Sequence, residues 1–378
     1  MRRHLLAPVA GIALLAACSD TTPGTGPECA SAPRLSEAPS PLSAPSPFDA
    51  EFRRAAAEFG VPVELLRSIG YVETRWEMVR GGEEFPGLPP AFGVMALRGE
   101  RLRRGAELAG VSEEATRTDP AANIRAAAAL LRGHAGALGI RGEDPEDWAP
   151  AVARFSGIDS PEGQASYVRD GVYRALRGGA AASRSSAGPP CKEDPPTNPN
   201  PSSPVEHPGA VWRPSPNFNE RTTPVHMVIV HTCEGSYAGC WSWLANPASG
   251  VSAHYVVRED GAEITQLVAE AKRAWHIGAT YDCNLNGAHE CSTLHGVQSN
   301  HFTIGVEHAG YASQTSWPAA QIDTSAKLVC EVTKRWQIPR DRFHIVGHAQ
   351  LQPYNRTDPG ANWPWAEYLA RIDAHCAG

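Results

Sequence analysis

Two histidines and one aspartate in the C-terminal half of the chain have types and positions suited to binding a metal ion. His231 ends the apolar run 225–230. His348 follows the run 343–347, and Asp358 lies ten residues further on in a Pro-Gly turn. A single histidine at a strand end is usually a structural residue, so the inference depends on the set. Because strand-end side chains emerge at the edge of a sheet, a turn can bring the carboxylate back towards them. Two imidazoles, one carboxylate and an open fourth position form a catalytic zinc site.

Six sequence blocks surround and include these residues. In chain order they are Val228–Thr232, Ser252–Val257, Asp260–Gly261, Ala274–Gly278, Ile304–Glu307, and a closing block made of Gly347–Ala349, Arg356–Gly360 and Trp363–Trp365. In content and order they resemble the zinc N-acetylmuramoyl-L-alanine amidases of the type-2 amidase, or peptidoglycan-recognition, family. The resemblance runs from residue 225 to 365. It implies an α/β amidase fold and hydrolysis of the amide bond between the lactyl group of muramic acid and the L-alanine of the stem peptide.

The resemblance also implies roles for individual side chains. His231, His348 and Asp358 would bind zinc. Glu307 would take the general-base position, accepting a proton from water for delivery to the leaving amine. Arg356 stands where many relatives carry a lysine aimed at the oxyanion, and arginine keeps that charge but changes its reach and donor geometry. Taken alone, Glu307 is better interpreted as a strand carboxylate that faces solvent, and only the set of motifs favours the catalytic role.

Three further side chains in these blocks are candidates for substrate binding. His254 lies in the second block, and Trp275 and His276 lie in the fourth, where the resemblance implies a loop that lines the muramyl-peptide groove. Packing in the protein core is the alternative interpretation for Trp275 and His276.

One acid in the N-terminal half could act as a proton donor. Glu73 lies near the end of an amphipathic helical pattern, beside Tyr71 and Trp76. Apolar neighbours of this kind raise the pKa of a carboxyl group. Resemblance to the lysozyme-like lytic transglycosylases extends over three segments: Gly70–Trp76, Phe92–Leu97 and Asn123–Ile124. It implies cleavage of a glycosidic bond with Glu73 as the single catalytic acid.

The sequence departs from that second family at three places. Thr74 replaces the usual serine, Ala96 stands where glutamine is common, and Arg154–Gly157 is a poor copy of the Ala-Tyr-Asn-Ala-Gly motif. Three interpretations therefore stay open: a catalytic Glu73, glycan binding without turnover, or a structural helix bundle with Glu73 on a solvated face.

Helices must position the residues around Glu73. Residues 48–177 are rich in Ala, Leu, Arg and Glu, and their apolar positions have helical spacing, which predicts an all-α, lysozyme-like domain. Asp119-Pro120 predicts the N-cap and first turn of a long helix that continues to Leu131. We expect the last helix of this domain at 161–176.

A sheet must position the predicted zinc ligands. Short β-branched runs within residues 211–378 predict four strands, at 225–231, 254–258, 302–307 and 343–346. Both parities of the first run are apolar, which indicates a central strand covered on both faces. Apolar residues that step by three and four predict a helix over 319–336. The predicted fold of this second domain is a mixed central sheet flanked by helices.

Residues 1–18 have the pattern of an export signal, with a basic start and an apolar run too short to span a bilayer. The signal ends in Leu15–Cys18, which resembles the bacterial lipobox and implies lipidation of Cys18. An ordinary cleaved signal with an incidental cysteine is the alternative. In a cell with two membranes, Ser19 resembles the second residue of lipoproteins sent to the periplasmic side of the outer membrane.

Two stretches, 19–47 and 178–210, are rich in Pro and Ser and nearly lack large apolar side chains. Such segments cannot bury enough surface to offset the entropy of ordering them. They are predicted to be a tether and an interdomain linker.

Eight of the nine cysteines remain once Cys18 is set aside, an even number that predicts disulfides in an oxidising compartment. Proximity in the sequence and elimination favour four pairs: Cys233–Cys240, Cys283–Cys291, Cys330–Cys376 and Cys29–Cys191. A metal cluster is the alternative, but the sequence contains no Cys-x-x-Cys pair.

The formal charge of −7 provides no basic field for nucleic acid and no polybasic face for a membrane surface. We predict an exported, lipid-anchored, zinc-dependent peptidoglycan amidase of cell-wall turnover or remodelling, with a lysozyme-like companion domain. The alternatives are a non-hydrolytic peptidoglycan-binding lipoprotein and a lytic transglycosylase acting through Glu73. No protein partner can be inferred from the sequence.

Overall fold

A computed structural model describes residues 41–85, 87–178 and 205–377 of the chain. Cys18, the tether, the Cys29–Cys191 pair and most of the linker lie outside these residues, so what the sequence indicates for them stays a prediction. Within the described ranges, no helix combines the length and the apolar character that crossing a membrane requires.

The N-terminal part of the described chain is built around the long helix α5 (Pro120–Ala137). Asp119 caps this helix as predicted, because its side chain accepts hydrogen bonds from the backbone N–H groups of Ala121 (3.3 Å) and Ala122 (3.2 Å). The Ala-rich faces of α5 allow close contact with its neighbours. The other helices in this part are α1 (Asp49–Phe59), α2 (Val63–Thr74), α3 (Gly99–Ala109), α4 (Glu113–Thr118), α6 (Ala149–Ser156), and the 3-10 turns η1 (Pro41–Ser43) and η2 (Pro145–Trp148).

The predicted last helix is present but irregular. It runs through α7 (Pro161–Ala165), the π-helical segment η3 (Ser166–Val172) and α8 (Tyr173–Leu176). Glu73 lies one residue before the end of α2, and Tyr167 faces it from η3. The π-helical segment therefore contributes directly to the surroundings of the predicted acid.

The expectation that this part is purely helical is wrong. The strands β1 (Val79–Arg80), β2 (Ala91–Gly93) and β3 (Leu97–Arg98) form a small antiparallel sheet. Strands of two or three residues are too short to produce a recognisable alternation of polar and apolar residues, so no local pattern indicates them. The described residues of the connection from β1 to β2, 81–85 and 87–90, are called the 81–90 loop below.

The C-terminal part contains a six-stranded mixed sheet, as predicted. Its strand order is β11-β6-β10-β7-β8-β4. The first four of these strands are parallel to one another, β8 runs antiparallel to β7, and β4 runs parallel to β8. The strands are β4 (Val211–Trp212), β6 (Met227–Thr232), β7 (Tyr255–Val257), β8 (Ile264–Gln266), β10 (Thr303–His308) and β11 (Ile345–Gly347), with β5 (Phe218–Glu220) and β9 (Lys272–Ala274) forming a separate pair.

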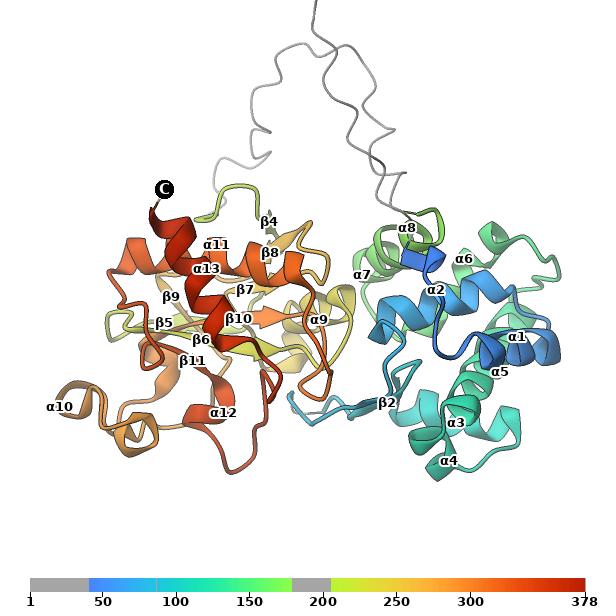
Figure 1. The fold of residues 1–378 in the computed structure, drawn as a ribbon, viewed down its shortest axis with the longest axis horizontal. Coiled ribbons are helices and arrows are strands. Elements are labelled where there is room, and N and C mark those ends of the chain that lie inside the picture. The colour runs from blue at the N-terminus through green and yellow to red at the C-terminus, as the bar shows by residue number, and fades with distance from the viewer. Residues whose placement is uncertain (1–40, 86, 179–204, 378) are drawn as a thin grey trace, which may run out of the picture. The chain divides into compact units, whose positions relative to one another are not determined.

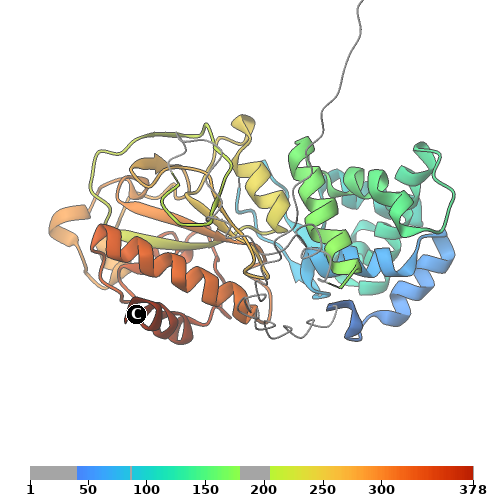
Figure 2. The ribbon, with the colours of Figure 1, turned by 90° about the horizontal axis from the view of Figure 1, so that it is seen from above.

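Helices and loops cover both faces of this sheet (Figures 1 and 2). The long helix α11 (Ala319–Trp336), with the bounds that the sequence predicts, lies beside α13 (Trp365–Ala377) over one face. Val228 and Val230 of β6 point into the core shared with these two helices. The alternate residues of β6 point to the other face, which is covered by loops and by the short helices α9 (Tyr237–Leu244), α10 (Cys291–Leu294) and α12 (His348–Leu351). Both parities of β6 are therefore buried, as expected for a central strand.

Three of the predicted disulfides are confirmed: Cys233–Cys240, Cys283–Cys291 and Cys330–Cys376. The first two close short loops on the face that carries α9 and α10. The third connects α11 to the end of α13 and so fixes the two covering helices to each other.

Candidate metal centre and catalytic site

The predicted metal ligands meet at the carboxyl ends of the parallel strands. His231 lies near the end of β6, and Glu307 of the neighbouring strand β10 is its partner in the register. His348 directly follows β11 as the first residue of α12. Asp358 lies in the loop after α12 and reaches back to both histidines. The sheet edge thus brings together residues up to 127 positions apart.

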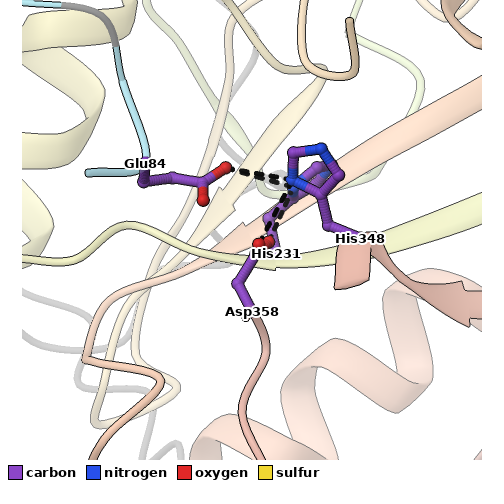
Figure 3. A group of neighbouring side chains, drawn as sticks. All are labelled: Glu84, His231, His348 and Asp358. Carbon is purple, nitrogen blue, oxygen red and sulfur yellow. Dashed lines mark hydrogen bonds and ion pairs between the residues drawn. The ribbon is translucent and has the colours of Figure 1, made fainter. Parts of the chain in front are cut away.

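Four buried side chains converge at this edge: Glu84, His231, His348 and Asp358 (Figure 3). Asp358 Oδ2 is 3.0 Å from His231 Nδ1, and Asp358 Oδ1 is 3.2 Å from His348 Nδ1. Glu84, from the 81–90 loop, places Oε1 3.1 Å from His348 Nδ1 and 3.7 Å from His231 Nδ1. The three predicted ligands are therefore adjacent, with a fourth carboxylate that the sequence did not indicate.

These four donor atoms fit a small divalent cation. One ligand atom from each residue lies within 4.8 Å of the others. The four contacts between the histidines and the carboxylates, which involve either oxygen of Asp358, are 3.0–3.7 Å long, close to the edges of about 3.3–3.6 Å expected for a tetrahedron with zinc–ligand bonds of about 2.0–2.2 Å. Asp358 Oδ1 is buried, lacks a well-aligned hydrogen bond and has His348 Nδ1 as its neighbour at 3.2 Å. A buried carboxylate oxygen without a hydrogen-bond donor is costly unless a cation lies next to it.

The charges of the cluster lead to the same conclusion. Burial lowers the pKa of His348, but Asp358 and Glu84 outweigh it and raise that pKa to about 10. Burial likewise lowers the pKa of His231, but Glu307 and Asp358 raise it to about 8. Both histidines therefore hold protons when no metal is bound, because the buried carboxylates require positive charge. A divalent cation supplies that charge instead.

A chain of hydrogen bonds fixes which nitrogen His231 presents to the cluster. Thr303 Oγ1 donates to the Ser299 carbonyl (2.8 Å), so it accepts from His276 Nε2 (3.1 Å). His276 Nδ1 then accepts from His231 Nε2 (2.9 Å). With a metal bound, His231 carries its proton on Nε2 and directs the Nδ1 lone pair towards Asp358. Metal-binding histidines are commonly oriented in this way by a partner of the second nitrogen.

His348 is oriented by a similar contact with the residue that follows α12. Its Nε2 donates to Gln352 Oε1 (3.2 Å), one helical turn further on, and Gln352 donates in turn to Asn355 Oδ1 (2.8 Å). This leaves Nδ1 of His348 directed at the carboxylates of the cluster. Both histidines therefore direct Nδ1 at the carboxylates of the cluster.

Two glycines permit this packing. A Cβ atom at Gly305 in β10 would lie 2.5 Å from Cγ of His276, and one at Gly347 would lie 2.7 Å from Cδ of Pro359. Any larger residue would displace either the ring that supports His231 or the turn that carries Asp358. Glycine is required at both positions by close approach.

Glu307 lies next to the cluster and is almost fully buried. Neither of its carboxylate oxygens makes a hydrogen bond. Burial raises its pKa to about 8, although the nearby His231 opposes the shift. The interpretation of Glu307 as a solvent-facing strand carboxylate is therefore wrong. A carboxylate with a raised pKa is a stronger base than an exposed one, as general-base catalysis near neutral pH requires.

Comparison with known proteins identifies the family of the C-terminal part of the chain. Residues 221–361 match the family model described as N-acetylmuramoyl-L-alanine amidase. Over 184 residues, the chain is 36% identical to N-acetylmuramoyl-L-alanine amidase A of Achromobacter lyticus, a match that covers 43% of this chain and 93% of that protein. The chain belongs to the N-acetylmuramoyl-L-alanine amidase family. Members of this family are hydrolases.

Other amidases are similar over a shorter region. The chain is 33% identical over 122 residues to the 1,6-anhydro-N-acetylmuramyl-L-alanine amidase AmpD of Citrobacter freundii. The matched region covers 32% of this chain and 57% of AmpD. Superposition on a crystal structure of a selenomethionine derivative of AmpD gives a TM-score of 0.36 at 26% sequence identity. The matched region covers 46% of this chain and 97% of that AmpD chain. The family assignment rests on the sequence matches, and these lie in the C-terminal part.

Arg356 of this amidase lies beside the cluster, but it faces Glu84. Its Nε is 3.6 Å from Glu84 Oε2, and its Nη1 donates to the Asn355 carbonyl (2.9 Å). About 18% of the side chain is exposed, so Arg356 can reach both the cluster and the solvent side. Its predicted contact with an oxyanion stays a prediction.

Two of the three predicted substrate contacts are structural in this amidase. His254 is fully buried, its Nδ1 accepts from the Gly305 backbone N–H (3.0 Å), and burial lowers its pKa to about 3. His276 is buried between His231 and Thr303. Neither ring offers a substrate much surface, because both support the strands and ligands behind the metal site. Trp275 is partly exposed and remains the candidate for substrate contact.

Glu73 in the helical part is also buried, so its placement on a solvated face is wrong. The Tyr167 hydroxyl donates to Glu73 Oε1 at 2.6 Å. Burial raises the pKa of Glu73, although Arg101 and Tyr167 oppose the shift. Glu73 also lines a cleft of about 750 Å³ whose walls include Arg98, Arg101, Trp241 and Trp243.

Sequence reasoning missed several residues of these sites. Gln352 lies four residues after His348, a spacing that places both on one helical face and could have been recognised. Thr303 and Tyr167 act through contacts between distant segments, for which the sequence carries no signal. Glu84 is the most unexpected, because it lies in a Gly- and Pro-rich loop of the other half of the chain.

Proposed function

We propose that this protein is a zinc-dependent peptidoglycan hydrolase that cleaves the amide bond between the lactyl group of muramic acid and the L-alanine of the stem peptide. The observation that carries the proposal is the convergence of His231, His348 and Asp358 beside the buried Glu307. The name of the relative AmpD refers to a 1,6-anhydro-N-acetylmuramyl-L-alanine substrate, which supports a muramoyl-L-alanine bond as the target. The biological role would be cell-wall turnover or remodelling.

The chemistry divides among the residues of the site. Zinc held by His231, His348 and Asp358 would supply Lewis acidity towards water and towards the amide carbonyl. A carboxylate oxygen of Glu307 would accept a proton from the attacking water and pass it to the departing nitrogen of L-alanine. The Arg356 guanidinium would donate to the oxyanion that develops on the carbonyl. The bond from the lactyl carbonyl carbon to that nitrogen breaks, which leaves a carboxylate on the glycan and a free stem peptide.

The test is digestion of purified sacculi with the full chain, with and without a zinc chelator, and analysis of the products by mass spectrometry. We expect free stem peptides and peptide-free glycan that disappear on chelation and return when zinc is added. The variant His348→Ala should behave like the chelated protein. His295→Ala, which removes an exposed histidine outside the cluster, should retain activity. Activity that survives both chelation and His348→Ala would refute the proposal.

A non-hydrolytic, peptidoglycan-binding role is the rival, and the same experiment separates it. Retained binding to sacculi without any released stem peptide would favour that role. The complete set His231, His348 and Asp358 supports hydrolysis, because loss of a ligand is what converts such a site into a recognition module.

A lytic transglycosylase activity of the helical part is a second candidate. It is favoured by one observation: Glu73 combines a raised pKa with a position in the 750 Å³ cleft. Burial that raises the pKa of a carboxyl group lets it keep its proton to a higher pH, as a general acid requires. Anhydro-muropeptides that form in the presence of chelator and disappear in Glu73→Gln would support this activity. Glycan binding without such products would leave Glu73 in a binding role.

The proposed location is the cell envelope, with a lipid anchor on Cys18. Three disulfides in the described residues support an oxidising compartment. Mass spectrometry of the protein purified from membranes would detect a lipidated N-terminal cysteine. Release of Cys18→Ser into the soluble fraction is the expected result, and unchanged membrane association would contradict the anchor.

A further inference from the structure

The 81–90 loop of the helical part extends into the metal centre. Glu84 from this loop is buried, with about 5% of its side chain exposed. Its carboxylate points at the two histidines, as Figure 3 shows. Its neighbour Glu83 in the same loop is exposed. Of these two adjacent glutamates, only Glu84 is buried. Burial of a carboxylate is unfavourable unless a positively charged group lies next to it.

Hydrogen bonds and apolar packing hold the loop in this position. The Gly82 backbone N–H donates to Glu234 Oε2 (2.9 Å), and Glu234 Oε1 accepts from the Ala312 backbone N–H (2.7 Å). Phe85, directly after Glu84, is buried in the apolar cluster that includes Trp241 of α9. The loop is thus fixed on both sides of Glu84, so the position of this carboxylate follows from contacts outside the cluster.

The contacts of Glu84 are those of a metal donor. Its Oε1 completes a set of four atoms around one point, at 3.1 Å from His348 Nδ1 and 3.7 Å from His231 Nδ1. With a metal bound, hydrogen bonds on the opposite ring nitrogens leave the Nδ1 lone pairs facing the carboxylates. Lone pairs on histidines and carboxylates that face each other repel unless a cation lies between them. The ion pair between Arg356 Nε and Glu84 Oε2 is long at 3.6 Å, so it neutralises the Glu84 carboxylate only weakly.

We infer that Glu84 is the fourth donor to the metal and that it caps the metal centre from within the same chain. The inference rests on the proposed function, because it requires a metal held by His231, His348 and Asp358. A catalytic zinc site needs an exchangeable fourth position for water or substrate. Here that position is taken by Glu84, so the structure represents a closed form of the amidase. Hydrolysis requires withdrawal of the Glu84 carboxylate, which also frees Arg356 to turn towards the substrate.

Metal binding provides a test that does not depend on activity. The test compares four full-length proteins: the wild type, Glu84→Ala, Glu84→Gln and the matched control Glu83→Ala. Competition for zinc with a chromophoric chelator measures the zinc affinity of each protein. Visible spectra of the Co²⁺-substituted proteins report the ligands around the metal. Loss of a supporting group around a metal ligand weakens affinity by roughly 10- to 100-fold, and loss of a donor should cost at least as much. We expect this loss and a changed Co²⁺ spectrum in both Glu84 variants but not in Glu83→Ala. Wild-type affinity and spectrum in Glu84→Ala would overturn the inference.

Hydrolysis of a soluble muropeptide by the same proteins tests the cap. If the closed form holds more than about nine tenths of the molecules, Glu84→Ala should raise kcat/KM by about 10-fold or more at saturating zinc. Weaker zinc binding without faster hydrolysis would overturn the cap. Glu84→Gln keeps the shape of the side chain, and circular dichroism identifies any variant that fails to fold. A wild type that binds no zinc and releases no peptide would instead refute the proposed function, so the two failures are distinguishable.

Discussion

His276 supports His231, and the absence of a side chain at Gly305 leaves the space that the His276 ring occupies. Gly305 lies beneath the imidazole of His276, and a Cβ atom there would be 2.5 Å from its Cγ. An ordinary contact needs about 3.4 Å, so in Gly305→Ala the ring must retreat by about 0.9 Å. The hydrogen bond from His231 Nε2 to His276 Nδ1 is 2.9 Å long. A shift of this size breaks or badly bends that bond.

Two effects of Gly305→Ala follow. Forcing a methyl group into a packed interior costs about 1–3 kcal/mol of folding free energy. For a domain of this size, that lowers the melting temperature by about 2–4 °C for each kcal/mol. In addition, His231 loses the partner that orients its metal-binding nitrogen, a change that weakens metal affinity by about 10- to 100-fold.

The assay combines thermal unfolding with zinc competition. Gly278→Ala is the matched control, because it adds a methyl group to the segment that carries His276 and its Cβ would meet nothing within 4 Å. His276→Ala removes the same hydrogen bond without adding volume, and it should match Gly305→Ala in zinc affinity. If Gly305→Ala were less stable but bound zinc as tightly as the wild type, the argument that His276 orients His231 would be refuted.

The remaining predictions concern stability. The folded chain binds the Glu73 proton more tightly than the unfolded chain, so the wild type loses stability as the pH rises from the ordinary value of 4.5 through the raised folded pKa. The stability of Glu73→Gln relative to the wild type should therefore increase from pH 4 to pH 8 in denaturant titrations, and a constant difference would contradict the raised pKa. Removal of the Cys330–Cys376 bond, which joins residues 46 positions apart, should cost about 4 kcal/mol, compared with about 2.6 kcal/mol for Cys283–Cys291, where the separation is 8. Equal losses in the two double-serine variants, measured by denaturant unfolding, would count against the loop-entropy account.

The elements that position the site were largely predictable because they carry strong local signals. The helix 319–336 has apolar residues on one face, and its bounds agree with those of α11. Strand β6 is apolar at successive positions, which is typical of a central strand buried on both faces. The small sheet β1–β3 was not predictable, since its strands are shorter than the window in which alternation can be recognised.

The candidate ligands were accessible to sequence reasoning for a similar reason. His231 and His348 follow apolar strand patterns, and in a parallel sheet the carboxyl ends of such strands meet at one edge. The roles of His254 and His276 were not accessible. A histidine next to a strand has the same local pattern whether its ring faces a groove or the interior, and only the packing of β10 against the segment that carries His276 decides between them.

The sequence by itself determined the family, the positions along the chain of the strands that carry the ligands, three cysteine pairs and the residue types of a metal site. These properties are encoded in short segments, where spacing and composition are enough. Tertiary structure alone decided that Glu84 joins His231, His348 and Asp358, and that Tyr167 faces Glu73. Such contacts depend on how distant segments fold together, and a Gly- and Pro-rich loop has no periodicity from which its destination could be inferred.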